Sequence, residues 1–288
     1  MFRPDGPARA GAAIRRLLLP LVLLLCGGAA QAQEGARTLP DLPPPQQAAE
    51  EEPPSPGSAA WSDIKAYYTA PLHWDGTDWA WFGASLAAIG VARHYDSQVR
   101  THFIKEGGPN VGSKSEDLND ALPTVAVLGG TWLYASLIDD TNGHREAWNM
   151  FEAAALSTVT AEVLKYAAGR EDPSQTSDPG QFFRSGRASP SEHATAAFAV
   201  GTVLAESGSD EYRWLRRLLG YGLGFATSYE RLRHNQHWLS DTVAGAALGA
   251  ASARFVLNRH SGDVGRPGQL ALEPVPGGAL LTYRHTFE

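Results

Sequence analysis

The sequence has little of several features that particular classes of protein need. Its 288 residues include one cysteine, Cys26, which excludes an intramolecular disulfide, a cysteine-cluster metal site and an iron–sulfur centre. Positive charge is also scarce, because 24 Lys and Arg stand against 31 Asp and Glu, for a net charge of −7. The first 32 residues hold four Arg and one Asp, so the remaining residues carry −10. This balance argues against nucleic acid as a partner and against purely electrostatic binding to anionic lipid.

Long hydrophobic runs are scarce as well. The segment from Ala121 to Ile138, 18 residues without a charge, is the one serious candidate for a transmembrane helix. Its Gly129-Gly130 pair and its alanines are typical of close helix packing, and we therefore favour a soluble or peripheral helical bundle over a membrane-spanning one. Since 43% of the residues are hydrophobic, the chain has enough apolar material for a core and is not a mostly disordered protein.

The start of the chain has the features of an export signal. Arg9, Arg15 and Arg16 precede the apolar run Leu17–Cys26, and Ala30-Gln31-Ala32 gives the small-x-small pattern of a cleavage site. The run is about ten residues long, too short to span a bilayer as a helix. We expect a signal peptide over residues 1–32, with an uncleaved anchor as the alternative. Export of this kind points to a Gram-negative periplasm or to a membrane surface that faces it.

A proline-rich acidic linker is expected over residues 33–60, because it contains seven prolines from Pro40 to Pro56 and the run Glu50-Glu51-Glu52. From Trp61 onward apolar residues recur at helical spacing, which predicts an all-α domain over residues 61–260. The last residues, 261–288, are expected to form a short extended or hairpin tail. The six helices are expected near 77–104, 119–138, 145–168, 191–206, 211–228 and 238–257.

Three segments contain residues that are able to act in catalysis or ligand binding: Lys165 to Pro173, Ser189 to Ala194, and Arg231 to Asp241. His237 and Asp241 are four residues apart, so on a helix the carboxylate can reach the imidazole and leave its other nitrogen free as a nucleophile or base. His193 falls in the first turn of a predicted helix, where free backbone N–H groups favour an anion. Together with the cations Lys165, Arg170 and Arg231, this set predicts an anion site suited to phosphoryl transfer.

Each of these residues also has a structural interpretation. Ser189, Pro190 and Glu192 have the pattern of an ordinary helix start, with a capping serine, an early proline and a glutamate that reaches back. His237 and Asp241 fit a surface pair, and single cations such as Lys165 fit a solvated charge. A metal bound through His234 and His237 lacks a convincing set of carboxylates, and we expect neither a metal nor a cofactor.

The order and spacing of the three segments resemble the type 2 phosphatidic acid phosphatase superfamily, which includes bacterial class A acid phosphatases and vanadium haloperoxidases. The resemblance rests on Lys165, six residues and Asp172-Pro173; on Pro190-Ser191-x-His193; and on Arg231, five residues, His237, three residues and Asp241. It covers about residues 75–258. It implies an all-α six-helix bundle of the acid phosphatase and vanadium haloperoxidase type.

The resemblance also implies a role for each matching residue. His237 would attack phosphorus and form a phosphohistidine, Asp241 would orient His237, and His193 would protonate the leaving oxygen. Water would then release phosphate, and vanadate would inhibit. The phosphoryl oxygens would be bound by Lys165, Arg231, Ser191 and the backbone N–H of Glu192, with Arg170 as a further cation.

Two residues depart from the family pattern, and both add negative charge. The family usually has Arg where this chain has Asp172, and Gly where it has Glu192. Arg170, Arg184 or Arg187 could replace the missing cation. We therefore expect a metal-independent phosphatase acting on phosphomonoesters, lipid phosphates or lipid pyrophosphates, with peripheral membrane contact. The alternatives are a catalytically weakened binding or scaffold protein that keeps an anion pocket, and a vanadate-dependent oxidase.

Overall fold

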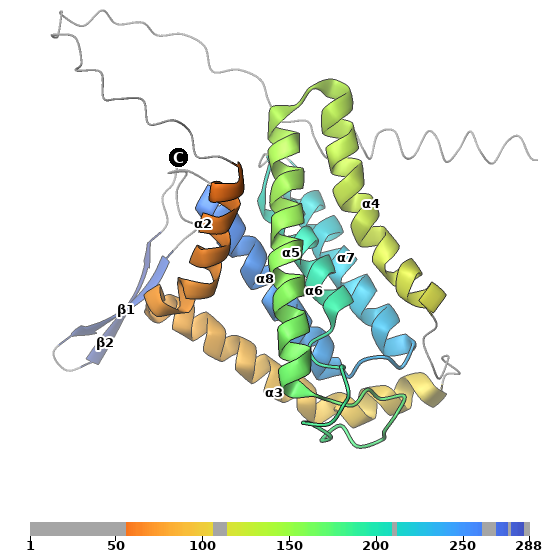
Figure 1. Ribbon diagram of the computed structural model, residues 1–288. Helices are drawn as coiled ribbons and strands as arrows, with labels where there is room; N and C mark the ends of the chain where they lie inside the picture. Colours follow the sequence, from red (N-terminus) through yellow and green to blue (C-terminus); the bar gives the residue numbers. More distant parts are fainter. Residues whose placement is uncertain (1–55, 106–113, 209–211, 261–268, 276–277, 285–288) are drawn as a thin grey trace, which may run out of the picture.

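A computed structural model describes residues 56–105, 114–208, 212–260, 269–275 and 278–284 of the chain. The expected signal peptide, and the expected linker as far as residue 55, lie outside these residues. The helices form a bundle, and a two-stranded hairpin follows it (Figure 1). The elements are α2 (Pro56–Thr69), η1 (Ala70–His73), α3 (Gly76–Lys105), α4 (Lys114–Ile138), α5 (Thr141–Ala168), α6 (Glu192–Glu206), α7 (Arg213–Arg233), α8 (Leu239–His260), β1 (Gln269–Val275) and β2 (Gly278–Arg284).

The prediction of an all-helical domain is confirmed, and α3 to α8 correspond to the six expected helices. The expected linker differs at its end, because α2 begins at Pro56 rather than after residue 60. Proline fits the first turn of a helix, where its missing N–H would have no partner within the helix. In the tail, β1 pairs with β2 as an antiparallel hairpin, with Gln269 opposite Arg284 and Val275 opposite Gly278.

Helix α6 is the centre of the bundle, and α5, α7 and α8 pack around it (Figure 1). Its sequence is apolar on every side, and eleven of its fifteen residues are buried. Gly201 lies against Gly220 of α7 so closely that a Cβ on Gly201 would be 2.1 Å from the Gly220 carbonyl oxygen. On the other side, a Cβ on Gly249 of α8 would be 2.2 Å from the Thr195 carbonyl oxygen. Small residues therefore set the distance between α6 and both neighbours.

Helix α4 does not pack as the sequence suggested. Gly129 and Gly130 have open space where a Cβ would lie, so the expectation that this pair marks close packing is wrong. In the part of the chain that the structure describes, Leu118–Ile138 is the one helical segment long and apolar enough to cross a membrane, and 11% of its most apolar window is buried. Helix α4 is thus packed on α5, α6 and α7 along one face and exposed on the rest, and the expectation of a soluble or peripheral bundle stays a prediction.

Large apolar side chains are exposed on the other outer helices too. Such patches normally mark contact with a membrane or another protein, because water solvates them poorly. They come from α3, α4, α5 and α7 and include Trp79, Trp81, Leu86, Leu122, Val125, Trp132, Leu133, Leu137, Trp148, Phe151, Val159, Val163, Trp214, Leu218 and Phe225.

The closely packed Gly201 and the exposed Gly130 give a matched pair of variants. Gly201→Ala should lower the free energy of unfolding by about 1–3 kcal/mol, because the new methyl group forces α6 away from α7. Gly130→Ala should raise it by up to about 1 kcal/mol, since alanine is the better helix former and meets nothing there. Thermal unfolding followed by circular dichroism measures both. Equal effects of the two substitutions would contradict the close α6–α7 contact.

Candidate active site

The three segments singled out in the sequence meet at one end of the bundle. This end is formed by the last turn of α5, the first turn of α6, the last turn of α7 and the first turn of α8 (Figure 1). A backbone hydrogen bond ties two of the segments directly, because Ser191 N–H donates to the carbonyl oxygen of Asp241 at 3.0 Å. The bundle therefore brings together residues 165, 191 and 237, which are far apart in the sequence.

His237 is buried, and its orientation is fixed by a main-chain acceptor. Its Nδ1 lies 2.7 Å from the carbonyl oxygen of Ala188, so Nδ1 carries a proton and donates it. The lone pair is then on Nε2, which lies 3.5 Å from an Nη2 nitrogen of Arg231. Burial lowers the pKa of His237 well below its usual value, and the charges of Arg231 and Lys165 lower it further. The ring is therefore neutral at neutral pH, with Nε2 available as a nucleophile.

The loop between α5 and α6 holds Ala188 in place through backbone hydrogen bonds. It begins at Gly169, which ends α5 in the left-handed conformation with φ 52°. Arg184 N–H then donates to the Gly169 carbonyl at 2.7 Å, and Ala188 N–H donates to the Arg170 carbonyl at 2.9 Å. The loop is thus folded back on the end of α5, which aims the Ala188 carbonyl at His237.

Asp241 does not orient His237 in the way the sequence suggested. Its nearest carboxylate oxygen is 4.0 Å from His237 Nδ1, beyond hydrogen-bond distance. That oxygen accepts from the backbone N–H of Trp238 at 2.9 Å instead, and the other one accepts from Arg170. Burial raises the pKa of Asp241 to about 7, while Arg170 opposes that shift. Asp241 therefore supports the loop before α8, and Ala188 takes the place expected for it.

Arg170 is part of a buried ion network and does not face the site. Its guanidinium lies between Asp241 of α8 and Asp96 of α3, and the Asp96 contact measures 2.6 Å. Its other bonds go to Ser240 Oγ at 2.8 Å and to the Pro179 carbonyl at 2.9 and 3.2 Å. These five bonds match the five N–H groups of an arginine, so no donor remains for a phosphate. The expected phosphate contact from Arg170 is therefore wrong.

Lys165 lies in a buried position at the end of α5 and pairs with two carboxylates. Its Nζ is 3.0 Å from Glu192 and 3.2 Å from Glu162. Arg187 contacts the same Glu162 and stacks on Tyr166 at 4.6 Å. The unusual acid Glu192 thus neither turns away from the site nor serves only as a cap, since it holds the lysine expected to bind phosphate.

Arg231 is held by α4. Its Nη1 donates to Asp120 at 3.0 Å, and the same carboxylate lies 3.4 Å from His234 Nδ1. His234 also lies 3.6 Å from Glu230, which gives it two acidic neighbours. These contacts fix the direction of the Arg231 guanidinium, whose other end faces His237.

The first turn of α6 presents its backbone to the same region. Ser191 is the N-cap, and its hydroxyl accepts from the N–H of Ala194 at 3.5 Å. His193 lies in this turn, close enough to His237 for its charge to lower the pKa of that residue. A helix start with free N–H groups favours bound anions. The second departure, Asp172, lies in the α5–α6 loop, where it accepts from the N–H of Ser174 at 3.1 Å and shapes a turn.

Three residues that matter to this geometry were not found from the sequence. Ala188 acts through its carbonyl, which every residue has, so no side-chain signal exists for it. Asp96 and Asp120 are single acids among 31 acidic residues, on helices that carry none of the recognised segments. Neither lies within an apolar stretch, since Asp96 stands between Tyr95 and Ser97 and Asp120 follows Asn119, so no sequence signal marks their burial.

The comparison with known families concerns this part of the chain. The model of the PAP2 superfamily matches residues 146–263, which include Lys165, Ser191, Arg231 and His237. This confirms the resemblance inferred from the three segments. The PAP2 segment spans most of α5 and all of α6, α7 and α8, whereas Asp96 and Asp120 lie before it.

Two further comparisons add little. No curated protein matches the chain. The crystal structure of LpxE from Aquifex aeolicus is similar to it, with 20% identity over 52% of this chain and 89% of that one. The TM-score is 0.35, which does not by itself establish a shared fold.

Arg170 is enclosed in a buried ion network, whereas Lys165 pairs with partly exposed acids. Substitution of Arg170 should therefore affect mainly stability, and substitution of Lys165 mainly vanadate binding. Arg170→Gln should lower the free energy of unfolding by about 3–5 kcal/mol, because it leaves two buried carboxylates without their cation. Lys165→Gln should have a smaller effect on stability but weaken vanadate binding, since Glu192 and Glu162 reach solvent. Urea unfolding and vanadate titration measure the two effects. A stable Arg170→Gln protein that fails to bind vanadate would restore Arg170 as a phosphate ligand.

Proposed function

We propose that this protein is a metal-independent phosphatase that acts through a phosphohistidine on lipid phosphates or lipid pyrophosphates. The observation that carries the proposal is the setting of His237. Its Nδ1 proton is committed to the Ala188 carbonyl, and its Nε2 lone pair faces the site beside Arg231. A neutral imidazole held in this way is a nucleophile that needs no further activation. The match of residues 146–263 to the PAP2 superfamily supports phosphoryl chemistry.

The proposed reaction has two steps. His237 Nε2 attacks phosphorus, the ester P–O bond breaks, and His193 gives a proton to the leaving oxygen. Water then attacks the phosphohistidine, His193 takes up the proton of that water, and inorganic phosphate leaves with His237 restored. Lys165, Arg231, Ser191 and the backbone N–H of Glu192 bind the phosphoryl oxygens in both steps. Such fixed donors stabilise the charge that develops in the transition state.

A lipid substrate is favoured by the surface around Lys165. The neighbouring side chains Leu164 and Tyr166 are 44% and 71% exposed, so apolar surface reaches the edge of the site. An acyl or isoprenyl chain could remain in an apolar phase while its phosphate reaches Lys165. The exposed apolar helix α4 is consistent with the same arrangement, in which the bundle is associated with a membrane.

We further infer that the protein is exported and that its site faces the periplasm. The support is the leader pattern over residues 1–32, which predicts translocation of everything that follows it. With α4 exposed, we expect membrane association to persist after cleavage of the leader. Recovery of the mature protein only with detergent would agree with this proposal, whereas the sequence favoured a soluble or peripheral bundle.

The nucleophile can be tested on purified protein with a panel of soluble and lipid phosphates. His237→Ala should abolish turnover, and His193→Ala should slow the substrates with poor leaving groups most, because they depend most on the proton. Native protein quenched in acid-free conditions during turnover should carry phosphate on histidine. Vanadate should inhibit, and EDTA should not.

Two outcomes would contradict the mechanism. One is full activity of the His237→Ala protein, and the other is turnover that begins only after a metal ion is added. Hydrolysis of soluble monoesters alone, with lipid phosphates untouched, would keep the mechanism but overturn the lipid substrate.

A second function, a weakened binding or scaffold protein, is favoured by one contact. Glu192 Oε2 lies 3.0 Å from Lys165 Nζ, so a carboxylate of the protein is already paired with the ammonium group that a phosphate would bind. Incoming phosphate must displace it. This contact lowers the affinity for every phosphorylated ligand, and the size of the effect decides between a working and a weakened enzyme.

Substitution of Glu192 should therefore improve the site. Glu192→Gln should tighten vanadate binding by up to about fivefold, because a partly exposed ion pair contributes at most about 1 kcal/mol. Asp172→Asn is the matched control, since it removes the other unusual acid from a turn without an ion pair to Lys165. Turnover that appears only in Glu192→Gln or Glu192→Gly would establish the weakened function. Tighter binding in the control as well would show a general charge effect instead.

A further inference from the structure

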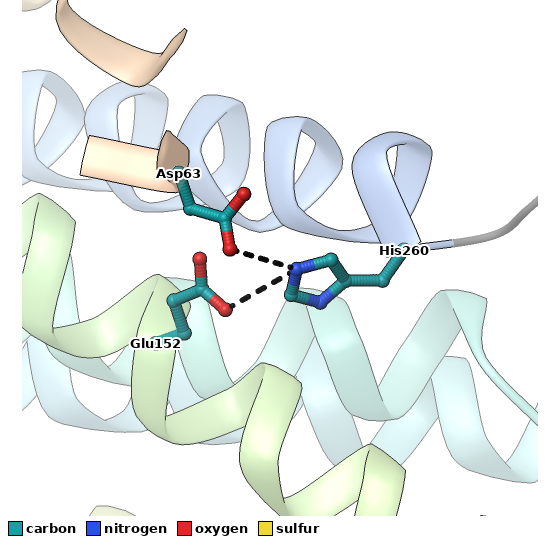
Figure 2. A group of neighbouring side chains, drawn as sticks. All are labelled: Asp63, Glu152 and His260. Atoms are coloured by element: carbon teal, nitrogen blue, oxygen red, sulfur yellow. Dashed lines mark hydrogen bonds and ion pairs between the residues drawn. The ribbon is translucent and has the colours of Figure 1, made fainter. Parts of the chain in front are cut away.

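A second cluster of functional side chains lies away from the candidate active site. Asp63 of α2, Glu152 of α5 and His260 of α8 point toward one another from three helices (Figure 2). One ligand atom from each lies within 4.8 Å of the other two. Glu152 is thirteen residues from Lys165 on the same helix, which is about 20 Å along its axis. The cluster is therefore separate from the phosphate site.

The imidazole of His260 is aimed at the two carboxylates by a buried amide. Its Nδ1 lies 2.9 Å from Asn149 Oδ1, an acceptor, so Nδ1 carries a proton. The lone pair of the neutral ring is then on Nε2. This nitrogen lies 3.4 Å from Asp63 Oδ2 and 3.6 Å from Glu152 Oε2 (Figure 2). An outer residue that fixes the ring through its other nitrogen is the usual support of a metal-binding histidine.

Two long contacts join the imidazole to the carboxylates, a hydrogen bond of 3.4 Å between Nε2 and Asp63 Oδ2 and an ion pair of 3.6 Å between Nε2 and Glu152 Oε2. A charge-assisted hydrogen bond between a protonated ring and a carboxylate measures about 2.7–2.9 Å, shorter than both contacts. Moreover, a single Nε2 proton can make a short, linear hydrogen bond with only one of the two carboxylates at a time. Ligands of a tetrahedral zinc ion, each about 2.0–2.1 Å from the metal, lie about 3.3–3.4 Å apart. The two measured distances are close to that value.

The surroundings also suit a bound ion. The side chains of His260, Asp63 and Glu152 are 24%, 16% and 15% exposed, so an ion can enter and water can complete its coordination. Arg259 takes the other oxygen of Asp63, which leaves Oδ2 for the cluster. Other links from α2 to the bundle include the bond from Tyr67 to Ser252 Oγ, at 2.7 Å.

We propose that Asp63, Glu152 and His260 bind a zinc ion that fastens α2 to α5 and α8. Imidazole nitrogen and carboxylate oxygen are both zinc donors, and a water would take the fourth position of a tetrahedral site. The ion replaces repulsion between the two acids with attraction to a shared centre. Its role is to hold the first described helix on the bundle, and it takes no part in phosphoryl transfer.

Zinc chloride and cobalt chloride are the probes, added to full-length protein that has been treated with a chelator. One equivalent of zinc should bind and raise the unfolding temperature, and cobalt should give the visible spectrum of a tetrahedral site. Asp63→Asn, Glu152→Gln and His260→Gln should each lose both signals. Asn149→Ala should weaken zinc binding about 10- to 100-fold, and Asn149→Asp should restore it, because aspartate keeps the acceptor for Nδ1.

Tyr67→Phe is the matched control, since it removes an α2 contact without removing a ligand. It should lower the unfolding temperature but keep the full zinc response. An absence of zinc binding, or a zinc response that survives in all three ligand variants, would overturn the proposal. Loss of stability in His260→Gln that is the same with and without zinc would show an imidazolium ion pair instead.

Discussion

The candidate site depends on one buried cation. Arg170 joins Asp96 of α3 to Asp241 of α8, and its guanidinium also lies 4.8 and 5.4 Å from the rings of Phe182 and Trp238. Without it, two carboxylates with no exposure would be buried with no cation between them, which costs several kcal/mol. The network fixes the start of α8, and with it the loop that carries His237. Arg170, which was expected from the sequence to bind phosphate, instead stabilises the positions of the other residues expected to bind it.

The residues that support the candidate site extend beyond the PAP2 segment. The PAP2 segment, residues 146–263, contains the groups expected to touch phosphate, but the two acids that hold its arginines come from earlier helices. Asp96 of α3 binds Arg170, and Asp120 of α4 binds Arg231. The segment therefore contains only part of its electrostatic support, such as the contact of Asp241 with Arg170. Helices α3 and α4 are as much a part of the site as the helices that carry the recognised segments.

Much of the helical layout could be predicted from the sequence, because α5 to α8 combine apolar spacing with clear breaks such as Gly169 and Ser207-Gly208. Which residues form the candidate site could also be predicted, since Lys165, Ser191 and His237 fall at the ends of predicted helices. The directions of the side chains could not. The spacing of His237 and Asp241 permits a contact, yet the Ala188 carbonyl is closer and accepts the hydrogen bond from Nδ1. Likewise, Gly129-Gly130 is compatible both with close packing and with open surface.

The Ala188 carbonyl has one more implication, for how such a site tolerates change. Because the acceptor for His237 belongs to the main chain, no side-chain replacement at position 188 removes it, and an alanine scan would be blind to it. The loop around it is likewise held by peptide groups at Gly169 and Arg170. Sequence drift in this loop can therefore be tolerated where side chains have room, but not at Gly169 or Gly186, where a Cβ would lie 2.5 and 2.2 Å from a backbone oxygen. Insertions, deletions and prolines are the changes that would turn the imidazole, so natural variation here should appear in composition and not in length.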